Sequence, residues 1–295
     1  MELSDLRVIE AVAREGGMSR AATALNTVQS NVTARVRALE QELGCVLFER
    51  HSRGVDLTPA GRRLLPYARR IAELAAEAAR AASDDGTPVG PLEIGALETT
   101  TALRLTPALA HFAAHYPDVD LALRTGTTAE LIDAVLERRL EGAFVCGPVS
   151  HRELVASEVF REDLAVFAAP GVASLAKALD GGDVRIIVLK AGCSYRQRLE
   201  TLLARRGIPV PRLLEFGTLE AIGRCVSAGL GITMLPVGMA GNVWPEGVVS
   251  VHRPGKRDSE VHTLFVRRRE AFVSSAMHAF LGEFGSVEAK PRRVA

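Results

Sequence analysis

The sequence is poor in cysteine: only four occur among its 295 residues, and no two of them form a C-x-x-C pair. The four are Cys45, Cys146, Cys193 and Cys225. Their wide spacing argues against a zinc motif and against a disulfide framework. His111 and His115, four residues apart, supply only two candidate ligands, so we expect no metal site. This use of cysteine is typical of a reducing compartment and predicts a location in the cytoplasm.

Long apolar runs are also missing. The longest uncharged stretch, residues 225–244, contains four glycines and a proline, which would break a membrane-spanning helix. The N-terminal residues lack the basic segment and apolar run of a secretory signal. We therefore expect neither export nor a membrane partner.

Common enzyme motifs are absent as well. The sequence contains no G-x-S-x-G, H-E-x-x-H, P-loop or G-x-G-x-x-G pattern. We therefore predict a protein that is not an enzyme, with no catalytic residues and no cofactor.

The composition is that of a globular protein, with 47% apolar and 24% charged residues. Its length suits two or three domains. The net charge of +1 hides an uneven distribution, because residues 1–70 hold 11 arginines and no lysine against 8 acidic residues. An N-terminal excess of positive charge fits a nucleic-acid-binding module.

Three short helices are predicted in residues 1–43. Ser4 is the expected cap of the first, which ends at Gly16-Gly17, and Ser19 is the expected cap of the second, over residues 20–25. A turn at Asn26-Thr27 leads to the third helix, over residues 28–43. This succession is typical of a helix-turn-helix.

The third helix is amphipathic. Its apolar stripe consists of Val32, Val36, Leu39 and Leu43, and another face carries Gln29, Ser30, Thr33 and Arg37. Such side chains suit base readout, because glutamine can bond to adenine and arginine to guanine in the major groove. A merely solvated helix face remains the alternative interpretation.

The segment after this helix favours DNA binding over that alternative. Residues 45–57 form two short apolar runs joined by a polar turn, which predicts a hairpin bearing Arg50 and Arg53. A hairpin of this kind places guanidinium groups on phosphate or in the minor groove. We therefore expect residues 1–57 to form a winged helix-turn-helix that binds double-stranded promoter DNA.

The sequence from Ala11 to Gly61 resembles the LysR-type transcriptional regulators, a family of bacterial winged helix-turn-helix proteins. The resemblance rests on A-A-x-x-L, Gln-Ser, R-x-R-x-L-E-x-x-L-G and L-F-E-R…L-T-P-A-G at the family's spacing. It implies DNA contacts by Gln29, Ser30, Thr33, Arg37, Arg50 and Arg53. Many members have proline after the Gln-Ser pair, whereas this chain has Asn31, itself a candidate DNA contact.

A long helix is predicted next, over residues 58–85, starting at Thr58-Pro59. Apolar residues recur along it at alternating spacings of four and three: Leu64, Ala68, Ile71, Ala75, Ala78 and Ala82. Such a seam suits pairing with a second helix, and packing on the same chain is the alternative. The family resemblance favours a homodimer or homotetramer. Residues 86–91 then read as a hinge.

Residues 92–295 alternate strand and helix patterns, which predicts parallel sheets with crossover helices. The resemblance extends here, most visibly in "AGLGITMLP", and implies a two-lobed α/β domain like a periplasmic binding protein, with a ligand cleft. Lobe I would cover about 92–161 and 265–290, and lobe II about 162–264. The expected fold is thus α/β multidomain: a winged helix-turn-helix, a linker helix and an effector-binding domain.

Ligand clefts in such domains lie at strand ends, where helix N-termini point their N–H groups inward. Hydroxyls and thiols cluster at these junctions: Thr99, Thr100, Thr101, Thr127, Cys146, Cys193, Ser194 and Thr218. We expect them to bind a small metabolite with a carboxylate or similar anion. Helix capping by the same hydroxyls is the alternative role.

Cys193 opens two further hypotheses. A thiol at a helix N-terminus near Arg196 can have a lowered pKa, which would suit a redox sensor or the nucleophile of a two-lobed enzyme. No histidine or carboxylate lies beside it in residues 191–196 to act as a base, and a buried inert cysteine is the competing interpretation.

Overall fold

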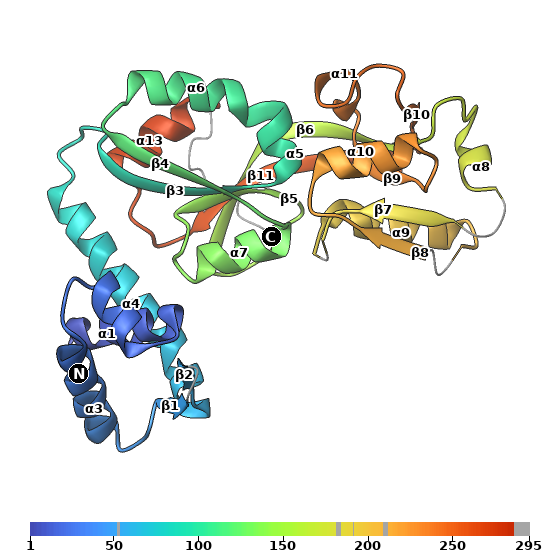
Figure 1. Ribbon diagram of the computed structural model, residues 1–295. Coiled ribbons are helices and arrows are strands. Elements are labelled where there is room, and N and C mark those ends of the chain that lie inside the picture. The colour runs from blue at the N-terminus through green and yellow to red at the C-terminus, as the bar shows by residue number, and fades with distance from the viewer. Residues whose placement is uncertain (52–53, 181–183, 191, 209–211, 286–295) are drawn as a thin grey trace. The chain divides into compact units, whose positions relative to one another are not determined.

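A computed structural model describes residues 1–51, 54–180, 184–190, 192–208 and 212–285, without the side chains of Arg50, Lys256 and Arg257 (Figure 1). Two compact units make up the chain, Met1–Asp84 and Asp85–Ala295. Within the described ranges, no helix is long and apolar enough to cross a membrane.

The first unit begins with three helices, α1 (Leu3–Glu15), α2 (Met18–Ala24) and α3 (Gln29–Leu43). They enclose one core in which Ile9, Ala21 and Val32 are fully buried. Gly16 and Gly44 end α1 and α3 in the left-handed conformation, which glycine adopts without strain.

Two expected helix caps are wrong. Helix α1 starts before Ser4, with Glu2 as its cap residue, and the Ser4 hydroxyl instead accepts a hydrogen bond from Arg35. Helix α2 starts at Met18, with Gly17 as its cap residue, so Ser19 lies inside the helix. Leu43, expected in the apolar stripe of α3, is 39% exposed because the core ends at Leu39.

A hairpin follows, formed by β1 (Phe48–His51) and β2 (Gly54–Leu57) in antiparallel register. Glu40 of α3 holds its start, accepting hydrogen bonds from the backbone N–H groups of Leu47 and Phe48 at 2.7 and 3.2 Å. Gly54 lies against the end of α1, where an added Cβ would come within 2.6 Å of the Gly16 carbonyl oxygen. The hairpin is therefore fixed to both α1 and α3.

Helix α4 (Pro59–Ser83) completes this unit, capped by Thr58 as the sequence predicts. It packs against α1, and Ala68 and Ala72 are buried on that side. The predicted seam is therefore wrong at Ala68, which packs within its own unit. The exposed apolar stripe consists of Ile71, which belongs to the predicted seam, together with Tyr67 and Leu74, which do not.

In the second unit, the first lobe contains β3 (Gly90–Ala96), α5 (Glu98–Thr100), the π-helical turn η1 (Thr101–Leu105), α6 (Thr106–His115), β4 (Val119–Thr125), α7 (Thr128–Leu136), β5 (Gly142–Cys146) and α13 (Ser275–Gly282). Strands β4, β3 and β5 are parallel, as expected. Helices α6 and α13 bury Phe112 and Phe280 against one sheet face, and α7 covers the other with Leu131 and Val135.

The second lobe contains α8 (Leu175–Ala178), β7 (Arg185–Val188), α9 (Ser194–Arg205), β8 (Arg212–Glu215), α10 (Leu219–Ser227), β9 (Thr233–Pro236), α11 (Met239–Asn242), β10 (Ser250–His252) and α12 (Lys256–Ser259). Strands β7 and β8 are parallel. Leu199 of α9 and Ile222 of α10 are fully buried in its core.

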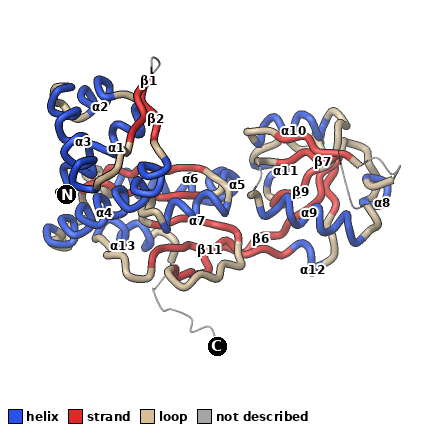
Figure 2. Tube along the Cα trace, turned by 90° about the horizontal axis from the view of Figure 1, so that it is seen from below, coloured by secondary structure: helices blue, strands red, loops and turns tan. Residues whose placement is uncertain are grey.

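Two strands connect the lobes, β6 (Leu154–Ala168) and β11 (Glu260–Arg268) (Figures 1 and 2). Strand β6 pairs with β11 up to Asp163, and from Leu164 onward it pairs with β9. Strand β11 is antiparallel to both β5 and β6, so the large sheet is mixed rather than parallel throughout. Residues near 163 therefore lie where the sheet passes from one lobe to the other.

Candidate DNA-binding and effector-binding sites

The N-terminal half of α3 presents an exposed polar face. Gln29, Ser30, Asn31 and Arg37 are exposed, and Arg37 has no partner among the described side chains. Thr33 differs, because its hydroxyl oxygen is buried and has no described hydrogen-bond partner. Four of the predicted α3 contacts are thus open to solvent, and the Thr33 hydroxyl is not.

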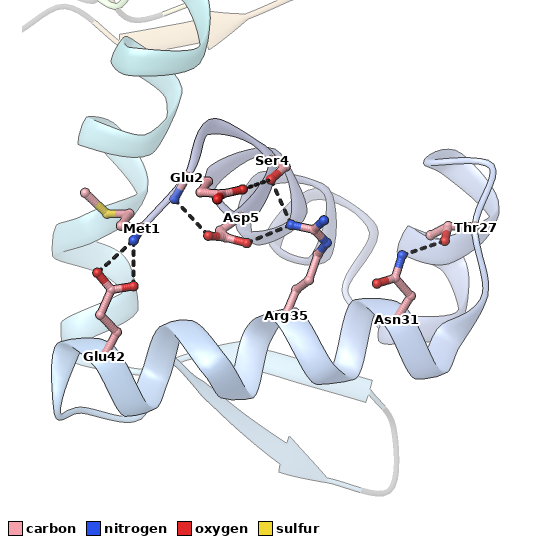
Figure 3. Close-up of polar contacts among 8 residues, drawn as sticks. All are labelled: Met1, Glu2, Ser4, Asp5, Thr27, Asn31, Arg35 and Glu42. Carbon is pink, nitrogen blue, oxygen red and sulfur yellow. Dashed lines mark hydrogen bonds and ion pairs between the residues drawn. The ribbon is translucent and has the colours of Figure 1, made fainter.

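Short polar contacts orient two of these side chains. The Ser19 hydroxyl donates to Oε1 of Gln29 at 3.2 Å. The Asn31 amide donates to Oγ1 of Thr27 at 3.0 Å, tying the first turn of α3 to the preceding loop (Figure 3). Asn31 therefore takes part in the turn before α3.

A second set of contacts fixes α3 against the start of α1 (Figure 3). The Arg35 guanidinium donates to Oγ of Ser4 at 2.7 Å and to Oδ1 of Asp5 at 2.9 Å. Farther along α3, the Glu42 carboxylate accepts from the Met1 amino group. Arg35 thus points toward α1 and is occupied, whereas Arg37 has no partner among the described residues.

The structure describes the two arginines of the hairpin only in part. Arg50 lies in β1, but its side chain is outside the described set. Arg53 lies outside the described residues altogether. Their predicted DNA contacts remain predictions.

The second unit holds a cavity of about 520 Å³ lined by both lobes. Leu97, Glu98 and Thr99 line it from the start of α5, and Thr127 and Glu130 from the start of α7. The second lobe contributes Lys190, Cys193, Tyr195 and Gly217 among others. Of the predicted effector-binding residues, Thr99, Thr127 and Cys193 line this cavity, while Thr100, Thr101, Cys146, Ser194 and Thr218 do not.

The start of α5 is an uncapped helix N-terminus at this cavity. No side chain caps it, so its first N–H groups lack the partners that a helix leaves to caps. Thr100 is fully buried there, and its hydroxyl has no described hydrogen-bond partner. Because this hydroxyl is buried and Thr100 does not line the cavity, a ligand in the cavity does not reach it. The Thr101 hydroxyl, in contrast, already donates to the Leu97 carbonyl at 3.1 Å.

The other predicted hydroxyls are engaged in local structure. Thr127 and Glu130 form a reciprocal capping box at the start of α7, and Thr218 caps α10. The Ser194 hydroxyl donates to Oγ1 of Thr128 at 3.3 Å, linking the two lobes. The same oxygen of Thr128 accepts from the Cys146 N–H at 3.2 Å. Capping and interlobe contacts therefore account for these positions.

Comparison with known proteins identifies the family. The profile described as "Bacterial regulatory helix-turn-helix protein, lysR family" matches residues 3–62, and "LysR substrate binding domain" matches residues 85–288. The HTH-type transcriptional regulator GltR of Bacillus subtilis (strain 168) is 41% identical over 281 residues, covering 95% of each chain. The uncharacterized HTH-type transcriptional regulator YusT of the same strain is 43% identical over 288 residues, covering 98% of this chain and 97% of its own.

The chain belongs to the LysR family of transcriptional regulators.

This LysR-type regulator also resembles solved full-length members. The structure of CbnR complexed with its target DNA has a TM-score of 0.68 and 26% sequence identity, covering 96% of this chain and 99% of that one. A full-length OxyR variant from Pseudomonas aeruginosa has the same TM-score at 22% identity, which supports the fold alone. The predicted fold class is confirmed, and the family is one of transcription regulators, not of enzymes.

The surroundings of Cys193 favour the interpretation of a buried inert cysteine over the redox-sensor and nucleophile hypotheses. Burial raises the pKa of the Cys193 thiol, and the nearby N–H groups of Arg196 and Tyr195 offset this only in part. Burial also raises the pKa of Cys146. A thiol whose pKa is raised carries less thiolate at neutral pH, which lowers its reactivity as a nucleophile or redox sensor.

Sequence patterns missed three residues of the regulator's sensing domain. Lys190 lines the cavity without a described ion-pair partner, Tyr195 forms part of its buried wall, and Glu162 is a buried carboxylic acid on β6. Lys190 follows strand β7, and the pattern of hydroxyls at strand ends does not predict a lysine there. Nothing in the local sequence marks Glu162 as buried, because two charged neighbours flank it.

Proposed function

We propose that α3 reads promoter DNA through Gln29, Ser30 and Arg37. Two observations support this: these side chains share an exposed face, and Arg37 has no partner in the described structure. Arginine without an intramolecular partner can bond bidentately to guanine or pair with a phosphate. Arg50 and Arg53 of the hairpin are proposed to contact the DNA backbone or minor groove beside it, and Asn31 to contact it secondarily. A regulator acting on promoter DNA works in the cytoplasm.

The proposed effector is a small anion bound in the cavity between the lobes. The observation that carries this proposal is the start of α5, which no described side chain caps and where Leu97, Glu98 and Thr99 line the cavity. A helix N-terminus attracts negative charge through its free N–H groups. Lys190 adds a cation from the second lobe, so one bound anion would contact both lobes.

A ligand of this kind regulates only if it binds one arrangement of the protein better than another. Contact with both lobes meets that condition, because the ligand's affinity then depends on their separation. We further propose that the Tyr67, Ile71 and Leu74 stripe of α4 pairs with a second copy of the chain, giving a homodimer or homotetramer that transmits the change to DNA.

Thermal unfolding in a panel of anions tests the effector proposal. Sulfate and straight-chain mono- and dicarboxylates would be compared with chloride at equal ionic strength. Saturation at about 100 times Kd adds about 2.7 kcal/mol of stability, which moves the unfolding midpoint by a few degrees. The shift should disappear in Thr99→Val, which removes a hydroxyl from the cavity wall, and persist in Thr201→Val, whose hydroxyl bonds within α9. If every anion acts like chloride, the proposed ligand class is wrong.

A further inference from the structure

One buried acid has no role in the function proposed above. The side chain of Glu162 is only 3% exposed and lies on β6, one residue before the strand's last pairing with β11. Its Oε1 atom accepts a hydrogen bond from Nε of Arg104 at 3.1 Å. Its Oε2 atom is buried and has no described hydrogen-bond partner. Burying an ionised carboxylate with one oxygen unpaired costs folding free energy, and such groups are uncommon in folded proteins.

The partner of Glu162 belongs to the helix that forms the effector cavity. Arg104 lies in the π-helical turn η1, which continues directly from α5. Its guanidinium carbon lies 5.9 Å from the ring centre of Phe160, two residues before Glu162 on β6. π-helical turns cost stability and are frequent at functional sites. The Glu162–Arg104 pair thus holds an irregular turn next to Thr99 and Thr100.

Glu162 also interacts electrostatically with a residue of the effector cavity's wall. The titratable groups that interact with it are Arg104 on η1, Tyr195 on α9 and Cys146 on β5. The Tyr195 phenol in turn lies 3.4 Å from Oγ1 of Thr99. Charged neighbours on the outer side line a second cavity together with Glu162: Arg161, Asp163 and Arg253. The carboxyl therefore bonds to the α5–η1 turn and interacts electrostatically with Tyr195, a residue of the effector cavity's wall.

Burial raises the pKa of Glu162, and the hydrogen bond and charge of Arg104 oppose that rise. The protonation state of this acid therefore depends on whether Arg104 stays in place. Conversely, a proton on Glu162 removes the charge that holds Arg104, whose half-exposed side chain can then turn to solvent.

We propose that Glu162 is a positioning residue of the effector cavity and that proton uptake by its carboxyl releases Arg104 and the α5–η1 turn. The inference rests on the proposed function, because it concerns regulation of the same cavity. Ionised Glu162 holds Thr99 and Thr100 in the arrangement described above. Protonated Glu162 loosens them, so the cavity opens as the pH falls.

The test uses Cys193, which lines the cavity, as a reporter that needs no effector. The full-length protein is labelled with methyl methanethiosulfonate, and modification of Cys193 is followed by peptide mass spectrometry between pH 5 and 9. Comparing Glu162→Gln with wild type at each pH cancels the titration of the thiol itself. Glutamine keeps the shape of the acid and resembles its protonated form.

The labelling rate of Glu162→Gln should exceed that of wild type about threefold or more at high pH, where wild type is held closed. The ratio should fall to one at low pH, where both carry a neutral side chain. Arg104→Gln should label as fast as Glu162→Gln, and the double variant no faster. Glu220→Gln, which removes a carboxylate from an exposed pair with Arg224, should match wild type throughout.

If the ratio of the labelling rates of Glu162→Gln and wild type is constant with pH, whatever its value, the proposal is overturned, because a purely structural role does not depend on the titration of Glu162. So does a rate for Arg104→Gln equal to wild type. Failure of the proposed function is recognised separately: if no anion slows labelling of Cys193 while the ratio still follows pH, the effector class is wrong and the role of Glu162 stands.

Discussion

Two arginines two residues apart on α3 offer a sharp test of the DNA-binding face. Arg37 is exposed and has no described partner, whereas Arg35 donates to Ser4 and Asp5. Truncation of Arg37 should therefore change DNA binding without changing stability. Truncation of Arg35 should do the reverse.

The expected magnitudes follow from these contacts. A bidentate arginine–guanine contact provides about 1–3 kcal/mol of discrimination, so Arg37→Ala should weaken binding about 5- to 150-fold. Arg35 and Asp5 keep 38% and 18% of their side chains exposed, so solvent screens their pairing. We expect Arg35→Ala to cost about 1 kcal/mol of unfolding free energy. The DNA affinity of Arg35→Ala should stay within about twofold of wild type, because Val32, Val36 and Leu39 still anchor α3 in the core.

Fluorescence anisotropy measures the affinities, with an operator selected by the wild-type protein from random-sequence DNA. Repeating the titration over a salt series separates the two kinds of contact. Loss of a phosphate contact lowers the slope of log K against log salt by about 0.9, whereas loss of a base contact relaxes specificity at one position. Urea unfolding measures stability, and Arg224→Ala, which removes an exposed side chain of α10, serves as the charge control. If Arg37→Ala binds like wild type, or if Arg35→Ala binds more weakly than Arg37→Ala, the assigned face is wrong.

Three other predictions follow from the structure. Ile71→Glu with Leu74→Glu, which places two charges on the exposed stripe of α4, should reduce the mass measured by light scattering to that of a monomer; an unchanged mass would exclude this stripe as the interface. Phe280→Ala, which removes a fully buried ring at 5.3 Å from Phe112, should cost about 3–5 kcal/mol in urea unfolding, and a loss under 1 kcal/mol would contradict the described core. The pKa of Glu162 in the folded protein is raised above its unfolded value. The wild-type carboxyl therefore adds to the free energy of unfolding below its unfolded pKa, and this contribution is lost as the pH rises through the folded pKa. Glu162→Gln should therefore gain unfolding free energy relative to wild type as the pH rises through that window, and a pH-independent difference would contradict the raised pKa.

The DNA-binding unit could be predicted almost completely from sequence because its signals are local. Helical spacing in α3, the glycine at its end and the Thr58-Pro59 start of α4 each act within a few residues. The wrongly predicted cap at Ser4 arose from a contact outside its own helix. Ser4 is a good cap residue in isolation, but Arg35 from α3 engages its hydroxyl, and no pattern within α1 reveals that contact.

The effector site was predictable only in part because its composition depends on tertiary contacts. Hydroxyls at strand ends located the cavity, and Thr99, Thr127 and Cys193 do line it. In the sequence, a hydroxyl that caps a helix, such as that of Thr218, looks the same as one without a described hydrogen-bond partner, such as that of Thr100. That difference depends on which groups the fold brings within hydrogen-bond distance.

Two buried side-chain oxygens without a described hydrogen-bond partner, one on Thr100 and one on Glu162, adjoin one short segment of the sensing domain. Thr100 lies at the end of α5, and Arg104, the sole described hydrogen-bond partner of the Glu162 carboxyl, lies four residues later in η1. A regular helix with satisfied neighbours would be more stable here, so a π-helical turn between two unsatisfied buried oxygens gives up stability at the cavity. A ligand that binds at the start of α5 beside Thr99 recovers part of that stability only in the arrangement that binds it. Such a difference between two arrangements is what a regulator needs, because binding energy that is equal in both would shift neither.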